Sequence, residues 1–279
     1  MSVQGRVITD PCCPWSWGSE PRLRRLALEF GDGLELRWVM GGMKRSISEA
    51  ERPEQVSHWL EAASETGMPL DPRLWAMGGI SSTYPACQAV VAACEQGPEA
   101  GGRYLRRLRE GLFCERKRLD HPDALIGEAG EAGLDVDRFE LDLRSNAIVE
   151  AFGAHLEEAR SVPEEAREQG GTGSTDGKER LTFPSVVFTG ADGERHWVYG
   201  VQPYERLRQA AAAAGAVALE ARVPEPLEVI ERFGRCATAE IVELTGRPRV
   251  VLEAELWGLA REWRLRAVPV LTGTLWEPA

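Results

Sequence analysis

The sequence lacks an apolar run long enough to cross a membrane and lacks a segment that marks secretion. Its alanine-rich stretch, Ala210–Leu219, is far shorter than the roughly 20 apolar residues that a membrane helix needs. The N-terminus has neither a basic region nor an apolar region ahead of a cleavage site. We therefore exclude an integral membrane protein and expect a cytoplasmic location, where thiols stay mostly reduced.

Metal-ligand spacing is also missing. The six cysteines, at positions 12, 13, 87, 94, 114 and 236, form no paired CxxC sets, and the four histidines are scattered. We predict no structural zinc and no other metal site. Cys87 and Cys94, seven residues apart, fit small core residues better than a redox pair, and Cys114 and Cys236 fit core or part-exposed thiols.

Positive charge is scarce. The 279 residues carry 44 acidic and 33 basic side chains, a net charge of −11, which disfavours non-specific binding of the whole molecule to nucleic acid. Hydrophobic residues make up 43% of the chain, so it is globular and can bury one large core or two modest ones.

The hydrophobic pattern predicts an α/β protein. A buried strand over Gly5–Thr9, a helix after Pro14 that ends before Gly31, and an alternating strand over Leu34–Met40 give the order βαβ. Two strands over Leu181–Thr189 and Arg195–Val201, followed by a helix over Gln202–Leu219, give the order ββα.

The segment between these halves is predicted to be a helical insertion. Helices are expected near 53–66, 85–96, 101–117, 121–132 and 135–162. The polar, glycine-rich stretch Pro163–Arg180 is expected to be a mobile loop. The predicted organisation is therefore one domain over 1–48 and 181–219, an all-helical insertion over 49–180, and a further domain over 224–279.

The last 56 residues read as three helices followed by a hairpin, which resembles a winged helix. They hold seven arginines, no lysine and nine glutamates, a net charge of −2. The residues that would form a local basic patch are Arg247, Arg249, Arg261, Arg264 and Arg266. Protein contact or dimerisation is favoured over DNA binding on charge grounds, and a solvated arginine–glutamate surface that caps the molecule is an equal alternative.

One string carries chemistry: Asp10-Pro11-Cys12-Cys13-Pro14-Trp15-Ser16-Trp17. Cys13 falls at the start of a helix, where unpaired N–H groups favour a thiolate, so we predict a nucleophile with a lowered pKa. Ser16 stands where a dithiol site would have its second thiol. Cys12 is a poor substitute, because a bridge between adjacent residues is strained. A site of this type forms mixed disulfides but cannot resolve them internally.

This string resembles the active-site motif of the DsbA-like thioredoxin superfamily, in particular its FrnE-type cytoplasmic branch, which typically carries D-P-x-C-x-W-C-W. The resemblance extends over about residues 1–219. It includes Ser82–Ala86 followed by Val90–Ala93, Phe113–Leu125, Phe183-Pro184-Ser185 and Gly200–Tyr204.

The resemblance implies a thioredoxin-like fold and assigns site residues. Cys13 and Ser16 would be the catalytic positions. Pro14, Trp15, Trp17, Phe183 and a cis Pro184 would bind substrate, although Trp15 and Trp17 suit core packing equally well. Asp10, a turn residue, and Cys12 would tune the thiol.

Whether the chain is an enzyme stays open at this point. One hypothesis is monothiol exchange with protein or small thiols, with glutathione as a co-substrate and no other cofactor. Another is non-redox thiol-ligand chemistry, as in the kappa-class glutathione transferases and their isomerase relatives. The alternative is a non-catalytic adaptor, since some members of the branch present a transcription factor to a protease, or a redox-sensing regulator that binds DNA.

Overall fold

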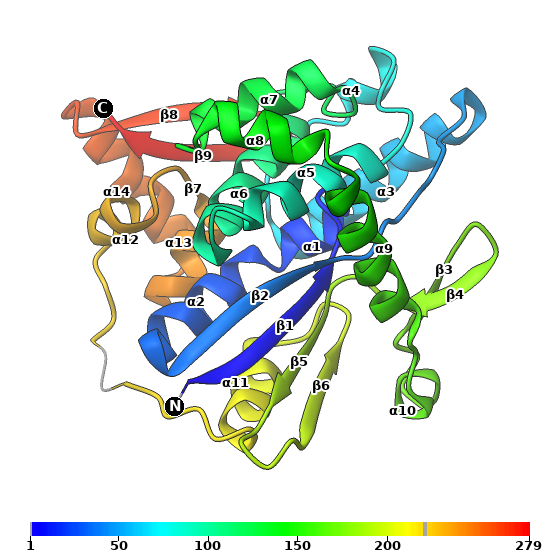
Figure 1. Cartoon of the computed structure of the whole chain (residues 1–279). Helices are drawn as coiled ribbons and strands as arrows, with labels where there is room; N and C mark the ends of the chain where they lie inside the picture. The colour runs from blue at the N-terminus through cyan, green and yellow to red at the C-terminus, as the bar shows by residue number, and fades with distance from the viewer. Residues whose placement is uncertain (1, 220–221) are drawn as a thin grey trace.

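A four-stranded mixed sheet lies at the centre of the N-terminal part of the molecule (Figure 1). The computed structural model describes residues 2–219 and 222–279. The strand order is β2-β1-β5-β6, and β1 pairs parallel with β2 and antiparallel with β5. The strands are β1 (Val3–Thr9), β2 (Leu34–Met40), β5 (Ser185–Thr189) and β6 (Arg195–Tyr199). The predicted βαβ and ββα halves are confirmed.

Each face of this sheet has its own helices. On one face α2 (Glu20–Phe30) and α11 (Tyr204–Ala213) cover β1 and β5, with Leu26 and Phe188 fully buried between them. The other face carries Ile8 and Val187 and is covered by the end of α9 (Asn146–Arg160), by α10 (Glu164–Glu168) and by β4 (Lys178–Leu181). The short helix α1 (Pro14–Gly18) follows β1 and is separated from α2 at Ser19.

The helical block fills the space beyond β2 and α1. Its centre is the apolar helix α5, which packs with Trp59 and Phe113 in the largest core of the molecule. The elements of this region are η2 (Glu49–Glu51), α3 (Arg52–Thr66), α4 (Arg73–Ala76), α5 (Tyr84–Cys94), α6 (Pro98–Phe113), α7 (Pro122–Glu131), α8 (Val136–Leu143), α9 (Asn146–Arg160) and α10 (Glu164–Glu168). The short helix η1 (Gly31–Gly33) lies outside it, between α2 and β2.

Several predicted boundaries are wrong. The helix expected over 135–162 is two helices, because the Ser145 hydroxyl accepts a hydrogen bond from the Ala147 N–H and starts α9 anew. The helix expected over Gln202–Leu219 ends at Ala213, just ahead of Gly215, whose φ is +97°. The turn of helix α4 was not predicted.

The segment Pro163–Arg180 is not the predicted mobile loop, so the insertion is not all-helical. It contains α10 and a hairpin of β3 (Thr172–Thr175) and β4 (Lys178–Leu181). Asp176 and Gly177 form the turn with φ of +51° and +74°, as a tight two-residue hairpin requires. Arg180 fixes the hairpin by donating to the Thr175 hydroxyl at 2.8 Å.

The C-terminal module, residues 224–279, consists of helices and one small sheet in the predicted order. A strand that was not predicted, β7, joins the expected hairpin to give the order β7-β9-β8. The elements are α12 (Pro226–Phe233), β7 (Cys236–Ala237), α13 (Thr238–Thr245), α14 (Arg249–Arg261), β8 (Leu265–Val270) and β9 (Gly273–Pro278). In the described ranges, no helix has the length and apolar character that a bilayer crossing demands.

A buried carboxylate joins this module to the rest of the chain. Glu240 on α13 is fully buried, forms an ion pair with Arg24 on α2 at 3.1 Å and accepts a hydrogen bond from Arg106 on α6 at 2.8 Å. Its second oxygen accepts from the Ala237 N–H at 2.7 Å. Because a buried charge is stable only when it is paired and hydrogen-bonded, these contacts fix α13 against α2 and α6.

Candidate functional site

Cys13 lies where β1 gives way to α1. The chain leaves β1 at Thr9 and turns, with the Cys13 N–H donating to the Asp10 carbonyl at 3.2 Å. Cys13 is the residue before the helix, with extended backbone angles, and Pro14 occupies the first helical position, where its missing N–H costs nothing. The cysteine is only 3% exposed. The sulfur is therefore held in a fixed and largely covered position.

The start of β5 faces this sulfur. The Cys13 Sγ lies 3.8 Å from the Phe183 carbonyl oxygen, and the Phe183-Pro184 peptide bond is cis. The Arg180 guanidinium lies over the Phe183 ring at 3.9 Å, and a Cβ at Gly41 would meet that ring at 2.1 Å. Phe183 and Pro184 therefore lie beside the thiol, although both are buried. The contributions of Arg180 and Gly41 were not predicted from the sequence.

The predicted lowering of the Cys13 pKa is wrong. Burial raises the pKa of this thiol, and the negative charge of Asp10 adds to the effect. The hydroxyl and backbone N–H of Ser16, together with Arg180, favour the thiolate but do not outweigh burial. Helix α1 is only five residues long, so its dipole contributes little.

Asp10 anchors the turn that carries Cys13. One carboxylate oxygen accepts from the Cys12 N–H at 2.8 Å. The other accepts from the Met43 N–H at 2.6 Å, from the Thr83 hydroxyl at 2.8 Å and from the Cys87 thiol at 3.3 Å. This full set of partners makes Asp10 a structural residue of the turn. The sequence did not identify Thr83 and Cys87 as partners of Asp10. Thr83 lies within the Ser82–Ala86 motif, and Cys87 directly follows it.

The remaining motif residues are buried, except Trp15. Trp17 is fully buried, donates to the Pro69 carbonyl at 2.9 Å and is not part of a substrate surface, which corrects one prediction. Cys12 is also a core residue, and burial raises its pKa well above the ordinary value. Trp15 is half-buried and donates to His58 at 2.7 Å. Ser16 is buried, and no other residue in the described part of the chain accepts its hydroxyl proton.

The other cysteines are free thiols, as are Cys12 and Cys13. Burial raises the pKa of Cys94 to about 11 and that of Cys236 to about 12. Cys94 lies at the end of α5, away from Cys87 and its Asp10 contact. The expected packing role agrees with this burial.

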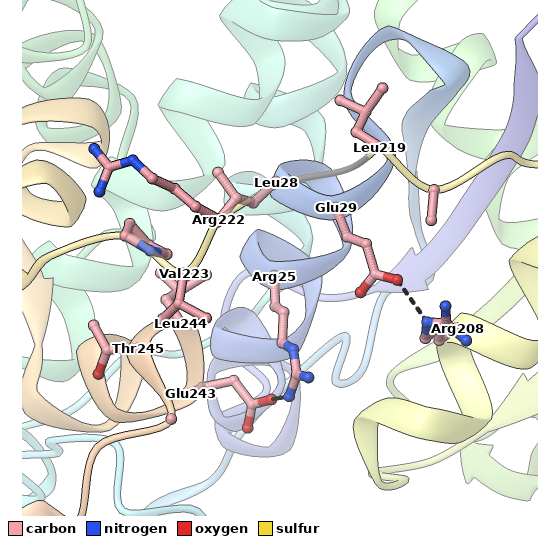
Figure 2. Close-up of a pocket in the computed structure, with 13 residues that line it drawn as sticks. Arg25, Leu28, Glu29, Arg208, Leu219, Arg222, Val223, Glu243, Leu244 and Thr245 are labelled. Atoms are coloured by element: carbon pink, nitrogen blue, oxygen red, sulfur yellow. Dashed lines mark hydrogen bonds and ion pairs between the residues drawn. The ribbon is translucent and has the colours of Figure 1, made fainter.

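A cavity away from Cys13 lies at the seam between α2, α11 and α13 (Figure 2). It has a volume of about 350 Å³. Two arginines in its wall are paired with carboxylates: Arg25 with Glu243 at 2.8 Å and Arg208 with Glu29. Figure 2 shows each guanidinium turned toward its own carboxylate partner. The charges in this seam hold neighbouring elements together, and we assign it no ligand.

The candidate basic patch of the C-terminal module is largely neutralised. Arg247 pairs with Glu225 and Glu255, and Arg249 pairs with Glu253 at 2.9 Å. Arg264 lies 3.9 Å from Glu262, and Arg266 pairs with Glu277. A phosphate backbone would have to compete with these carboxylates, which weakens the argument for DNA binding.

A cysteine at the first turn of a helix, opposed by the carbonyl before a cis proline within this sheet, defines a thioredoxin-like protein. Residues 7–162, more than half of the chain, match the protein-family model Thioredoxin_5, described as Thioredoxin. The chain belongs to this thioredoxin family.

Among curated proteins, the chain is similar to the ClpXP adapter protein SpxH of Halalkalibacterium halodurans. The two are 28% identical over 282 residues, which cover 97% of this chain and 87% of that protein. Among solved structures, a protein assigned as a protein disulfide isomerase from Nitrosomonas europaea has a TM-score of 0.63 at 21% identity, and covers 76% of this chain and 97% of its own. The cytosolic disulfide reductase DsbM of Pseudomonas aeruginosa has a TM-score of 0.56 at 23% identity, with 70% and 88% covered.

Proposed function

We propose that this protein is a cytoplasmic adaptor that delivers a protein client to a ClpXP-type protease. The observation that carries the proposal is the extent of the match to SpxH, which covers 97% of the chain and so includes the C-terminal module. The two solved thiol-oxidoreductase folds cover 76% and 70% of the chain. The similarity to thiol enzymes therefore extends over only part of the chain, whereas the similarity to the adaptor extends over nearly its whole length.

The site chemistry supports binding over turnover. Ser16 replaces the thiol that would expel a mixed disulfide, and Cys12 is adjacent to Cys13 and buried in the core. Cys13 is itself covered, with a raised pKa, so little of it is thiolate at neutral pH. The cis proline beside Cys13 is present, whereas the groups needed for rapid exchange are absent.

The C-terminal module supports a protein contact. In this proposal the chain divides into a thioredoxin-like part over 1–48 and 181–219, an insertion over 49–180 and a winged-helix-like module over 224–279. On the module Val250 is 80% exposed, Trp257 52% and Trp263 86%. Exposed aromatic side chains beside arginines are typical of protein interfaces and are not needed to bind phosphate.

A proteome-wide measurement of protein half-lives tests the adaptor proposal. We expect deletion of this gene to lengthen the half-life of a small set of proteins. Deletion of ClpX should lengthen the half-life of the same proteins, with no further effect in the double deletion. Expression of the Cys13→Ala variant should restore their turnover. A failure of the two deletions to share any protein would contradict the proposal.

A second candidate function is monothiol exchange, which the position of Cys13 beside the Phe183 carbonyl supports. In this reaction the Cys13 thiolate attacks the disulfide of oxidised glutathione. A Cys13–glutathione disulfide forms and one glutathione thiolate leaves. A second external thiol must then release Cys13, because Ser16 cannot. Mass spectrometry of acid-quenched protein tests this candidate: glutathione attached to Cys13 supports it, and a free Cys13 thiol after exposure to oxidised glutathione contradicts it.

A further inference from the structure

Among the residues that the structure describes, strand β6 has one edge without a pairing strand. It is the last strand in the order β2-β1-β5-β6 (Figure 1). The Gly190 N–H donates to the Glu194 carbonyl at 2.9 Å, and the Gly200 N–H donates to the Pro184 carbonyl at 2.8 Å. Hydrogen-bonded pairs alternate along an antiparallel ladder, so even-numbered residues of β6 face β5.

The odd-numbered residues of β6 therefore point their main-chain groups outward. They are Arg195, Trp197 and Tyr199. Among the described residues, these outward groups have one recorded partner, the Gln202 side-chain amide, which donates to the Tyr199 carbonyl at 3.0 Å. Every second residue of this edge thus presents its N–H and C=O groups outward, which is the arrangement with which another strand pairs.

A groove follows this edge. It has a volume of about 490 Å³ and runs between Glu165 on α10, with Gln169 just after that helix, and α11, which contributes Arg206 and Gln209. Strand β6 supplies its floor. Because α10 lies on one face of the sheet and α11 on the other, the two helices flank the edge without covering it.

The Tyr199 hydroxyl is an independent sign of a ligand. Tyr199 lines the groove and is 6% exposed, and its hydroxyl is buried without a hydrogen-bond partner in the described ranges. A buried hydroxyl without a partner is destabilising and uncommon in native structures. Its ring stacks on Trp197 with centroids 5.5 Å apart and planes 14° apart, so its position is fixed.

The lining indicates the chemistry of the occupant. Two carboxylates, Glu165 and Glu194, balance two guanidiniums, Arg195 and Arg206. The lining also holds three glutamines, whose amides pair with main-chain groups as donor and acceptor. A groove without net charge beside free backbone groups favours an extended segment with few charged residues over an acidic or basic one.

We propose that β6 accepts an extended, largely uncharged segment of a protein partner as a fifth strand of the sheet, with the Tyr199 hydroxyl bonded to that segment. The inference deepens the proposed adaptor function, because it assigns a client segment to a definite edge. Backbone pairing supplies affinity in such additions, and alternate side chains supply selectivity.

A phage library of random decapeptides, selected on the full-length protein, tests the proposal. Enriched peptides should have few charged residues. A scan of N-methylated peptide bonds in one of them should show loss of binding at every second position and tolerance between, which only strand pairing produces. Uniform tolerance of N-methylation would overturn the proposal.

Matched variants locate the site. Arg195→Pro removes one outward N–H without touching the ladder to β5, and should weaken peptide binding at least tenfold, whereas Arg195→Ala should bind nearly as wild type. Tyr199→Phe should weaken binding about fivefold, the usual loss for one hydrogen bond, without lowering the thermal stability of the free protein. Peptides that bind all three variants equally would overturn the proposal, as would self-association of the wild type that Arg195→Pro abolishes.

The two proposals fail separately. If client turnover by ClpXP is normal in the Arg195→Pro and Tyr199→Phe variants, the edge is wrong and the adaptor function stands. If the decapeptides bind with the alternating pattern but no protein depends on this chain and ClpX for turnover, the adaptor function is wrong and the strand site stands.

Discussion

Cys13 shows how one covered sulfur changes the chemistry expected of a motif. Its position after β1 agrees with the site predicted from Asp10–Trp17, but its buried environment does not favour the predicted thiolate. Burial dominates over the favourable contacts from Ser16, so the neutral thiol is the stable form at neutral pH. A thiol in this state reacts slowly with disulfides.

Alkylation across pH tests this description of Cys13. In the native protein we expect slow labelling at pH 7 and a rate that rises only as the pH passes the ordinary thiol pKa of about 8.5. Ser16→Ala should move the rise to still higher pH, because it removes a group that favours the thiolate. Mass spectrometry of the Cys13 peptide gives the rate, with urea-unfolded protein as the reference. Full thiolate reactivity below pH 7 would contradict the assignment.

Asp10 carries a second prediction at this scale. Asp10→Ala leaves two backbone N–H groups and the Thr83 hydroxyl without their acceptor inside the core. We expect it to lower the free energy of unfolding by about 3 kcal/mol, since each buried donor without a partner is costly. Urea unfolding measures the loss, and Asp32→Ala at an exposed position serves as the control. Equal stability of the two variants would show that Asp10 is not an anchor.

Among the elements, the hairpin β3–β4 shows the limit of composition as a guide. Its strands are four residues each and mostly polar, so they resemble a loop, and their pairing partner is known only once Asp176-Gly177 is recognised as a turn. The hairpin also reaches the rest of the fold, because the Thr175 hydroxyl donates to the Met43 carbonyl at 2.9 Å.

Hydrogen exchange separates a hairpin from a mobile loop. We expect amides within Thr172–Thr175 and Lys178–Leu181 that bond across the hairpin to exchange much more slowly than those of Asp176 and Gly177 at the turn. Gly177→Val should speed exchange in both strands, because a β-branched residue resists a φ of +74°. Rapid exchange throughout the segment in the wild-type protein would support the loop instead.

Much of the fold was predictable because local pattern decides it. The alternation in Leu34–Met40 and the capping signals at Pro85 and Gly67 lie within a few residues of the structure that they determine. Contacts between distant residues decide the rest. The burial of Cys13 depends on Phe183 across the sheet, and no local signal connects Arg24 to Glu240.

The whole molecule is held together by paired charges at the seam of the C-terminal module. Burial alone would raise the pKa of Glu240, but Arg106 and Arg24 outweigh it and lower that pKa below its ordinary value. The guanidiniums of Arg107 and Arg235 likewise lower the pKa of Glu115 to about 2 against the effect of its burial. The module is thus part of one charge network with α2 and α6.

This network predicts a defined loss of stability in acid. A carboxylate whose pKa is lowered by folding stabilises the native state fully above the ordinary pKa of about 4.3, and that contribution is lost as the pH falls through the folded value. The free energy of unfolding measured in urea should therefore fall steadily as the pH is lowered from about 4.3 to about 2, the pKa of Glu115 in the folded protein. A free energy of unfolding that is constant across this range would contradict the pairing.

Substitution of Glu240 tests the seam directly. Glu240→Gln leaves Arg24 and Arg106 buried without their counter-charge, and we expect a loss of about 3 kcal/mol in the free energy of unfolding. Glu253→Gln, in an exposed pair with Arg249, should change little. If the two substitutions have the same effect, the seam does not depend on Glu240.

The central claim is that the protein works as an adaptor without using the Cys13 thiol. The most direct test is the degradation rate of an identified client by purified ClpX and ClpP with wild-type protein, with the Cys13→Ala variant, and with neither. We predict that both proteins accelerate degradation equally. Acceleration by the wild type that is lost in a correctly folded Cys13→Ala variant, or no acceleration by either, would contradict the claim.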